Sequence, residues 1–74
     1  MLDLNRFVRN DSALLKALEA QKHLDFADNE RRAAARWENA GMADRAKACK
    51  LAEEGHRQAA KKFLAEAERL CPDG

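Results

Sequence analysis

The sequence predicts an all-α fold, a helical hairpin of two long antiparallel helices, and three observations indicate it. Ala, Leu, Glu, Lys and Arg dominate from residue 13 to residue 70, where strand-forming residues are scarce. Apolar residues recur at helical spacing in two stretches of similar length. Gly41 lies between these stretches, and the only proline, Pro72, follows the second one.

The first helix is expected over residues 12–39. Asn10, Asp11 and Ser12 are candidate N-caps just before its first apolar residues. A glycine directly after the last periodic residue is typical of a helix C-terminus. The segment DNE at 28–30 interrupts the apolar spacing, so two alternatives stay open: one continuous helix, bent near this segment, or a new helix that begins there.

The second helix is expected over residues 43–70, after a turn at 40–42. Its apolar stripe keeps its three- and four-residue steps across Gly55, so this glycine should weaken the helix by about 1 kcal/mol without ending it. Glu53 and Arg57, four residues apart, form a favourably oriented ion pair on the helix surface.

A hairpin closed at Gly41 also fixes which residues face each other. When two helices run antiparallel from this turn, residues whose numbers sum to about 82 lie level with each other. This register predicts that Phe26 lies beside His56 and that Trp37 lies beside Arg45.

The small core of a chain of 74 residues favours self-association. Roughly half of its hydrophobic residues are alanine, which removes little surface from water when it is buried. We therefore expect a homodimer in which two hairpins form a four-helix bundle, the simplest closed arrangement with twofold symmetry. Core and dimer contacts are expected at Leu15, Leu18, Phe26, Trp37, Met42, Cys49, His56, Phe63 and Leu70.

The chain is expected to form a single helical domain, residues 1–74, with an N-terminal arm at 1–11 and a tail at 71–74. The arm is apolar at four positions, Leu2, Leu4, Phe7 and Val8. It is expected either to fold back over the bundle or to reach across to the second subunit.

Residues that could catalyse a reaction or bind a metal are few and unsuitably spaced. His23 and His56 belong to no recognised ligand pattern such as C-x-x-C or H-E-x-x-H. Ser12 is the only serine, and no base lies at a spacing that would orient it. Cys49 and Cys71 lie about 33 Å apart if one helix holds both, which is too far for a disulfide within a chain. We expect no enzyme, no metal and no cofactor.

The charge balance argues against nucleic-acid and membrane partners. Lys and Arg number 14 against 13 Asp and Glu, whereas a nucleic-acid-binding protein normally has a basic excess on one face. No apolar run approaches the length of a membrane-spanning helix, and the N-terminus has no signal-peptide pattern, so a cytoplasmic location is expected. Weak nucleic-acid binding stays an alternative because basic residues cluster on the second helix at Lys47, Lys50, Arg57 and Lys61.

A second protein partner is expected to contact the arm and the basic cluster of the first helix. Arginines beside apolar side chains are common anchors in protein interfaces. The expected partner-binding residues are Leu4, Phe7, Val8, Arg31, Arg32 and Arg36.

The segment GHRQAAKKFLAEAERLCP, residues 55–72, resembles the second helix of a tetratricopeptide repeat. Its glycine is followed by Ala60, Leu64 and Ala67 at the spacing of that repeat. The preceding helix lacks the large aromatic residue usual in that family, and no second repeat follows. The resemblance implies a chain reversal at Gly55 and a helical module that docks peptides, as the alternative to the hairpin.

In size and layout the whole chain resembles the small helical-hairpin proteins with which bacteriophages disable host regulators, among them quorum-sensing anti-activators. The resemblance rests on length and layout and on no motif. It implies a homodimer that binds a host transcription activator, or another host protein, and blocks its DNA-binding or assembly surface. The expected function is therefore that of a small non-enzymatic regulator or inhibitor that acts by protein–protein interaction.

Overall fold

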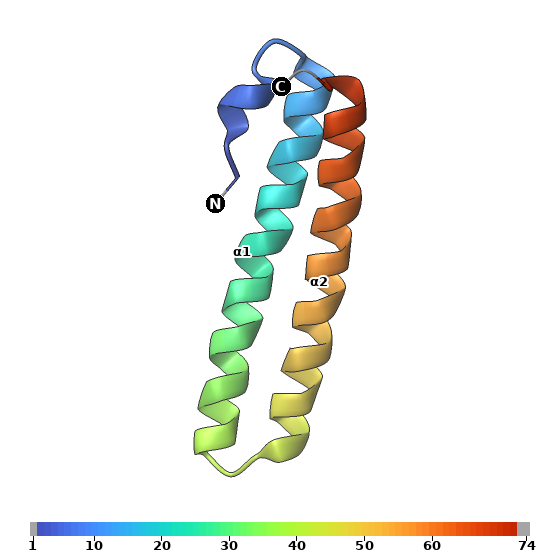
Figure 1. The fold of residues 1–74 in the computed structure, drawn as a ribbon. Helices are drawn as coiled ribbons and strands as arrows, with labels where there is room; N and C mark the ends of the chain where they lie inside the picture. Colours follow the sequence, from blue (N-terminus) through green and yellow to red (C-terminus); the bar gives the residue numbers. More distant parts are fainter. Residues whose placement is uncertain (1, 73–74) are drawn as a thin grey trace.

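Two long antiparallel helices make up most of the fold, as the sequence predicts. In the computed structural model, which describes residues 2–72, a 3-10 helix η1 (Leu4–Phe7) precedes α1 (Asp11–Asn39) and α2 (Ala43–Leu70). Figure 1 shows α1 and α2 side by side along their length, with η1 and the last turn of α2 in the half away from the turn at residues 40–42. The molecule measures 48 × 16 × 14 Å and is therefore a slender rod.

Both helices are unbroken at the two places where the sequence left alternatives. α1 continues through residues 28–30, so no new helix begins there. α2 continues through Gly55, so the chain reversal implied by the tetratricopeptide-like segment is wrong. The turn lies at residues 40–42, and the predicted bounds of both helices agree with the structure to within one residue.

The turn is built around Gly41, whose φ of 76° lies in the left-handed region. Glycine adopts this region without the steric cost that a Cβ atom adds. The Met42 N–H donates to the Trp37 carbonyl at 2.9 Å, and the Gly41 N–H donates to the Glu38 carbonyl at 3.0 Å. These two bonds form a Schellman motif, which satisfies carbonyl groups left free at the end of α1.

Asn10 begins α1 and also ties it to the end of α2. Its side-chain oxygen accepts a hydrogen bond from the Ala13 N–H at 3.0 Å, the usual N-cap contact. Its side-chain amide donates to the Leu70 carbonyl at 3.1 Å. One side chain thus satisfies a free donor of α1 and a free acceptor of α2.

The helices meet along a line of buried alanines that recur at intervals of seven residues, which we call the alanine seam. Its members are Ala13, Ala20, Ala27 and Ala34 of α1 and Ala46, Ala60 and Ala67 of α2. Seven residues make slightly less than two turns of an ideal helix, so a seam of this period favours a left-handed twist of the pair. Glu53 holds the remaining position in α2, where its side chain is only 17% exposed and accepts two hydrogen bonds from Arg57.

Two contacts across the hairpin confirm the predicted register. The ring centroids of Phe26 and His56 are 5.2 Å apart. The guanidinium carbon of Arg45 lies 4.9 Å from the centre of the Trp37 ring. The short turn and the seam therefore hold α1 and α2 in the alignment that an antiparallel hairpin closed at Gly41 requires.

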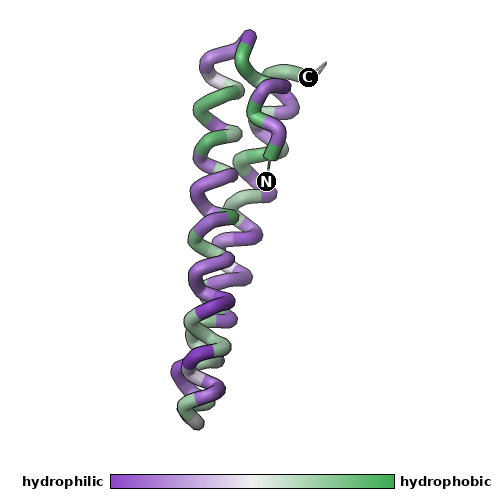
Figure 2. Tube along the Cα trace, turned by 90° about the vertical axis from the view of Figure 1, so that its left-hand side faces the viewer, coloured by the Kyte–Doolittle hydropathy of each residue, from purple (hydrophilic) through white to green (hydrophobic). Residues whose placement is uncertain are grey.

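Large apolar side chains gather at the end of the rod that holds η1 and the last turn of α2. Among the described residues, Phe7 is the only large side chain that is fully buried, and it packs with Ala13, Ala17 and Ala67. Figure 2 shows most of the strong green in this half of the tube, whereas the half near the turn is largely purple or pale. The arm therefore folds back over its own hairpin, one of the two positions expected for it.

Candidate protein-interaction surfaces

One side of the alanine seam carries rings and a thiol, and we call it the aromatic face. In two helices that pack along a seam of this period, residues seven apart lie on the same side of their helix. Positions 23, 30 and 37 of α1 therefore form one row, and positions 49, 56 and 63 of α2 form another. Contacts between rings join the two rows. The aromatic face consists of His23, Phe26, Trp37, Cys49, His56 and Phe63.

Four rings meet at the end of this face that lies away from the turn. The Nδ1 atoms of His23 and His56 are 2.9 Å apart, so one of them donates a hydrogen bond and the other accepts it. The His23 ring stacks on Phe63 with a centroid separation of 5.6 Å, and it meets Phe26 edge-on at 6.1 Å. A hydrogen bond and aromatic contacts thus hold the four rings as one patch, in which Phe26 is exposed and the other three rings are half-buried. The Lys16 ammonium lies 5.5 Å from the centre of the Phe63 ring.

Toward the turn the aromatic face continues with Trp37 and Cys49. The Arg45 guanidinium covers the Trp37 ring in a cation–π contact. Desolvation raises the pKa of the Cys49 thiol, a hydrogen bond with the Glu30 carboxylate raises it further, and Arg36 offsets only part of this. The thiol is therefore protonated near neutral pH and behaves as a small apolar side chain.

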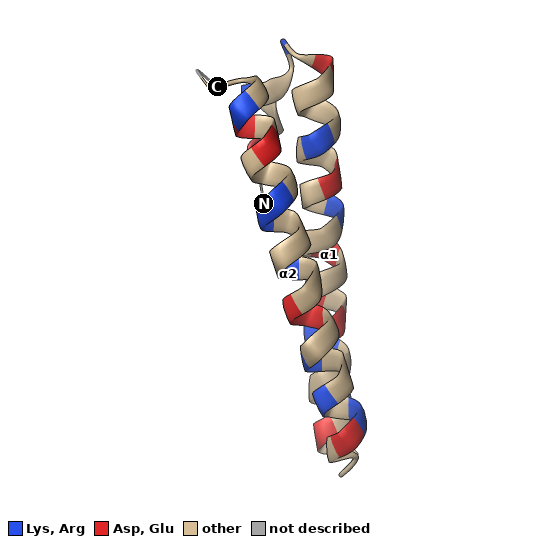
Figure 3. Cartoon of the chain, turned by 90° about the vertical axis from the view of Figure 1, so that its right-hand side faces the viewer, with Lys and Arg blue, Asp and Glu red and all other residues tan. Residues whose placement is uncertain are grey.

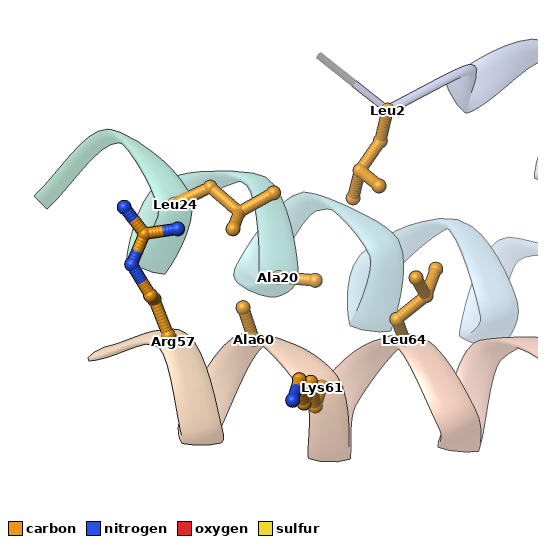
Figure 4. Close-up of a pocket in the computed structure, with 7 residues that line it drawn as sticks. All are labelled: Leu2, Ala20, Leu24, Arg57, Ala60, Lys61 and Leu64. Carbon is orange, nitrogen blue, oxygen red and sulfur yellow. The ribbon is translucent and has the colours of Figure 1, made fainter. Parts of the chain in front are cut away.

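The other side of the seam is partly covered by the arm, and a groove of about 140 Å³ lies beneath it. We call it the arm groove. The Leu2 N–H donates to the side-chain oxygen of Gln21 at 2.9 Å, which fixes the end of the arm over α1. Figure 4 shows Leu2 descending toward the two helices, opposite the alanine floor. The lining residues are Leu2, Ala20, Leu24, Arg57, Ala60, Lys61 and Leu64.

Charges of both signs are interspersed along the helices. In the view of Figure 3, blue and red segments are mixed along both α1 and α2. Two ion pairs connect the helices, Lys16–Glu66 at 3.1 Å and Lys50–Glu38 at 2.5 Å. Because these side chains are well exposed, each pair contributes little to stability.

The arm residues expected to contact a partner do not all lie at the surface. Phe7 is 1% exposed and belongs to the core, so the prediction that it contacts a partner is wrong for this conformation. Leu4 packs against the same core cluster. Val8 is exposed.

The basic residues predicted to contact a partner lie far from the arm, on the part of α1 nearer the turn. Arg31, Arg32 and Arg36 are all exposed. Arg31 pairs with Asp28 at 3.8 Å on the same helix. The structure therefore does not bring the arm and the arginines together into one surface.

The residues expected in the core and the dimer also divide into two groups. Half-buried residues are Trp37, Cys49, His56 and Phe63. Exposed residues are Leu15, Leu18, Phe26, Met42 and Leu70. The hairpin is held by alanines in their place, and the role of these residues in a dimer stays a prediction. Leu51, which sequence reasoning did not single out, is the most exposed large apolar side chain.

Comparison with known protein families, with curated proteins and with solved structures finds no match for this chain. Neither helix of the described part has the apolar length that crossing a bilayer requires. Within residues 2–72 no three His, Cys, Asp or Glu side chains converge where they could share a metal ion. A function can therefore be inferred only from the aromatic face, the arm groove and the charged residues around them.

Proposed function

We propose that the chain is a non-enzymatic protein–protein interaction protein that works as a homodimer, in which the aromatic faces of two hairpins pack together as a four-helix bundle. The observation that carries this proposal is the contrast between the alanine-built core and the rings beside it, which the single hairpin leaves half-buried or exposed. Phe26 is 40% exposed, whereas eight of the nine residues that are buried within 2–72 are alanines.

The energetic reason is the small amount of apolar surface that alanine removes from water. Burial stabilises in proportion to apolar area, so an alanine methyl contributes far less than a leucine or phenylalanine side chain. The single hairpin keeps most of its larger side chains half-buried or exposed. Packing two aromatic faces together would bury these rings and supply the driving force that one chain lacks.

The size of the face also suits a specific dimer. One broad side of a rod of 48 × 16 × 14 Å has a footprint of roughly 770 Å². A standard protein interface buries about 800 Å² on each partner. Positions 23–37 of α1 span only about 21 Å of this length at 1.5 Å per residue. This side of the rod is thus large enough for a stable pair, provided that the interface extends beyond the rings of the aromatic face toward both ends.

Sedimentation equilibrium of the wild-type chain and two matched variants tests the dimer. Phe26→Glu places a charge on the aromatic face and should give monomers that keep their helical circular dichroism. Leu51→Glu makes the same change at a side chain that is 68% exposed and outside that face, and it should leave the dimer intact. A wild-type chain that sediments as a well-folded monomer would overturn the proposal, as would dissociation by Leu51→Glu alone.

For the second partner we propose a host transcription activator or another host regulator, as the resemblance to phage-type hairpin inhibitors implies. Uncovered surface outside the aromatic face, including Arg31, Arg32 and Arg36, supports a second contact. Capture from a bacterial lysate should retain a regulator on the wild-type dimer and lose it when the three arginines are changed to glutamate. Lys62→Glu serves as the control. Absence of any retained regulator contradicts this part of the proposal.

A further inference from the structure

We propose that the arm groove docks an acidic segment of a partner protein by one leucine- or phenylalanine-sized side chain, with an adjacent carboxylate at the basic edge of the groove. This inference rests on the proposed function, because it names the chemistry of the second partner. It concerns the side of the seam away from the aromatic face, so the groove stays open in the proposed dimer.

The shape of the groove follows from the alanine seam. Ala20 and Ala60 are buried members of the seam, and their methyl groups leave space above them that larger residues would fill. Leu24 and Leu64 stand on either side of this floor, and Leu2 of the arm closes part of the opening (Figure 4). The result is a recess with apolar walls that opens to the surface.

The volume selects a single side chain as the occupant. The groove measures about 140 Å³. An apolar cavity of about 150 Å³ holds one benzene molecule, so the groove matches a phenyl ring or a leucine side chain and is too small for a longer apolar chain. Interfaces commonly use such an anchor in a small pocket, surrounded by polar contacts.

The edge of the groove is basic, and its lining contains no carboxylate. The Arg57 guanidinium is held in place by the Glu53 carboxylate through two hydrogen bonds. Among the ion pairs of residues 2–72 none involves Lys61, whose ammonium group is exposed. Lys61 therefore lies free to meet an anion beside the apolar recess, and an acidic segment is the complementary partner.

Peptide titration followed by amide NMR shifts tests the proposal. The probe is the capped peptide acetyl-Glu-Phe-Glu-amide, with acetyl-Glu-Ala-Glu-amide and acetyl-Lys-Phe-Lys-amide as controls. The first peptide should shift the amides of Ala20, Leu24, Ala60 and Leu64, and the controls should shift them at least several-fold less at equal concentration. Equal shifts with the lysine peptide, or shifts confined to the aromatic face, would overturn the proposal.

Two neighbouring lysines supply a matched pair of variants. Lys61→Glu reverses the charge at the groove and should raise the dissociation constant of the acidic peptide about threefold or more. Lys62→Glu makes the same change at an exposed lysine that does not line the groove and should leave the constant unchanged. Equal effects of the two variants would show that only net charge matters and would contradict a docking site.

Phenylacetate tests a different source of the same chemistry. If it binds the groove as tightly as the peptide does, the site takes a small carboxylic acid and the assignment to a protein partner is wrong. Sedimentation equilibrium of the same samples measures dimerisation independently of peptide binding. Failure of peptide binding with an intact dimer rejects the groove alone, and loss of the dimer with intact peptide binding rejects the aromatic interface alone.

Discussion

Asn10 donates a hydrogen bond from its side-chain amide to the carbonyl of Leu70, so the residue that begins α1 also holds the last turn of α2. Asn10→Ala removes this bond and the N-cap contact with Ala13, and it should lower the free energy of unfolding by about 1–2 kcal/mol. Asn10→Asp keeps the N-cap but loses the donor, so its effect should be smaller. Urea denaturation at one fixed protein concentration measures both, and equal losses would contradict the double role.

The two described glycines should respond to alanine in opposite directions. An added Cβ meets no atom within 4 Å at either Gly41 or Gly55. The two substitutions therefore differ only in the backbone conformation that the alanine must adopt. Gly55→Ala should raise the free energy of unfolding by about 1 kcal/mol, because alanine favours the helix and restricts the unfolded chain. Gly41→Ala should lower it by about 1–2 kcal/mol, because φ there is 76°. Thermal unfolding followed by circular dichroism compares them, and a stabilising Gly41→Ala would contradict the turn geometry.

The alanine seam should tolerate no larger side chain. Ala34 is 3% exposed, whereas its neighbour Ala35 faces solvent. Ala34→Leu must push the helices apart and should lower the free energy of unfolding by about 1–3 kcal/mol. Ala35→Leu should change it by less than about 0.5 kcal/mol. If chemical denaturation finds the two variants equally stable, the helices do not meet along this line.

The reactivity of Cys49 should depend on Glu30. Because the Glu30 carboxylate raises the pKa of the thiol, Glu30→Gln should lower that pKa and increase the thiolate fraction at a given alkaline pH. Iodoacetamide should then modify Cys49 faster, as mass spectrometry of a Cys71→Ser background would show at a protein concentration at which sedimentation finds the monomer. Glu19→Gln is the control, because the Glu19 carboxylate does not affect the pKa of Cys49. An unchanged rate in Glu30→Gln would contradict the contact.

Local chemistry accounts for what the sequence predicts well. The bounds of α1 depend on the N-cap Asn10 and the left-handed Gly41, whose preferences act within a few residues. α2 begins directly after the turn at Gly41 and ends just before Pro72, which cannot continue a helix. The register follows once Gly41 is the turn, and the contacts of Phe26 with His56 and of Trp37 with Arg45 confirm it. Such features need no knowledge of the distant parts of the chain.

The composition of the core was harder to predict, because large apolar residues are a stronger signal than small ones. Leu15 and Leu18, which are expected in the core or the dimer contact, are exposed in the single hairpin. The decisive signal is the recurrence of alanine at intervals of seven, which begins at Ala13 in α1 and at Ala46 in α2 and is interrupted only by Glu53. Of the other predicted positions, Trp37, Cys49, His56 and Phe63 are half-buried. The remaining three, Phe26, Met42 and Leu70, are exposed.

The position of the arm depends on contacts between residues far apart in the sequence. The Cys71 thiol contacts the Arg6 carbonyl at 3.5 Å, and the backbone of Leu2 binds Gln21. No local pattern in residues 1–11 encodes these neighbours. The arm groove, which needs Leu2 as one wall, was therefore not predicted.

Because the alanines of the seam repeat every seven residues, alignments in which α2 is shifted along α1 by one repeat are nearly equivalent in side-chain fit. Sliding α2 along α1 by one repeat would again bring most methyl groups opposite methyl groups, so side-chain fit alone selects an alignment weakly. Within one chain, residues 40–42 are too short a tether to permit such slippage. Lengthening this tether with flexible residues should thus broaden the native state into several shifted forms, although every alanine remains in place.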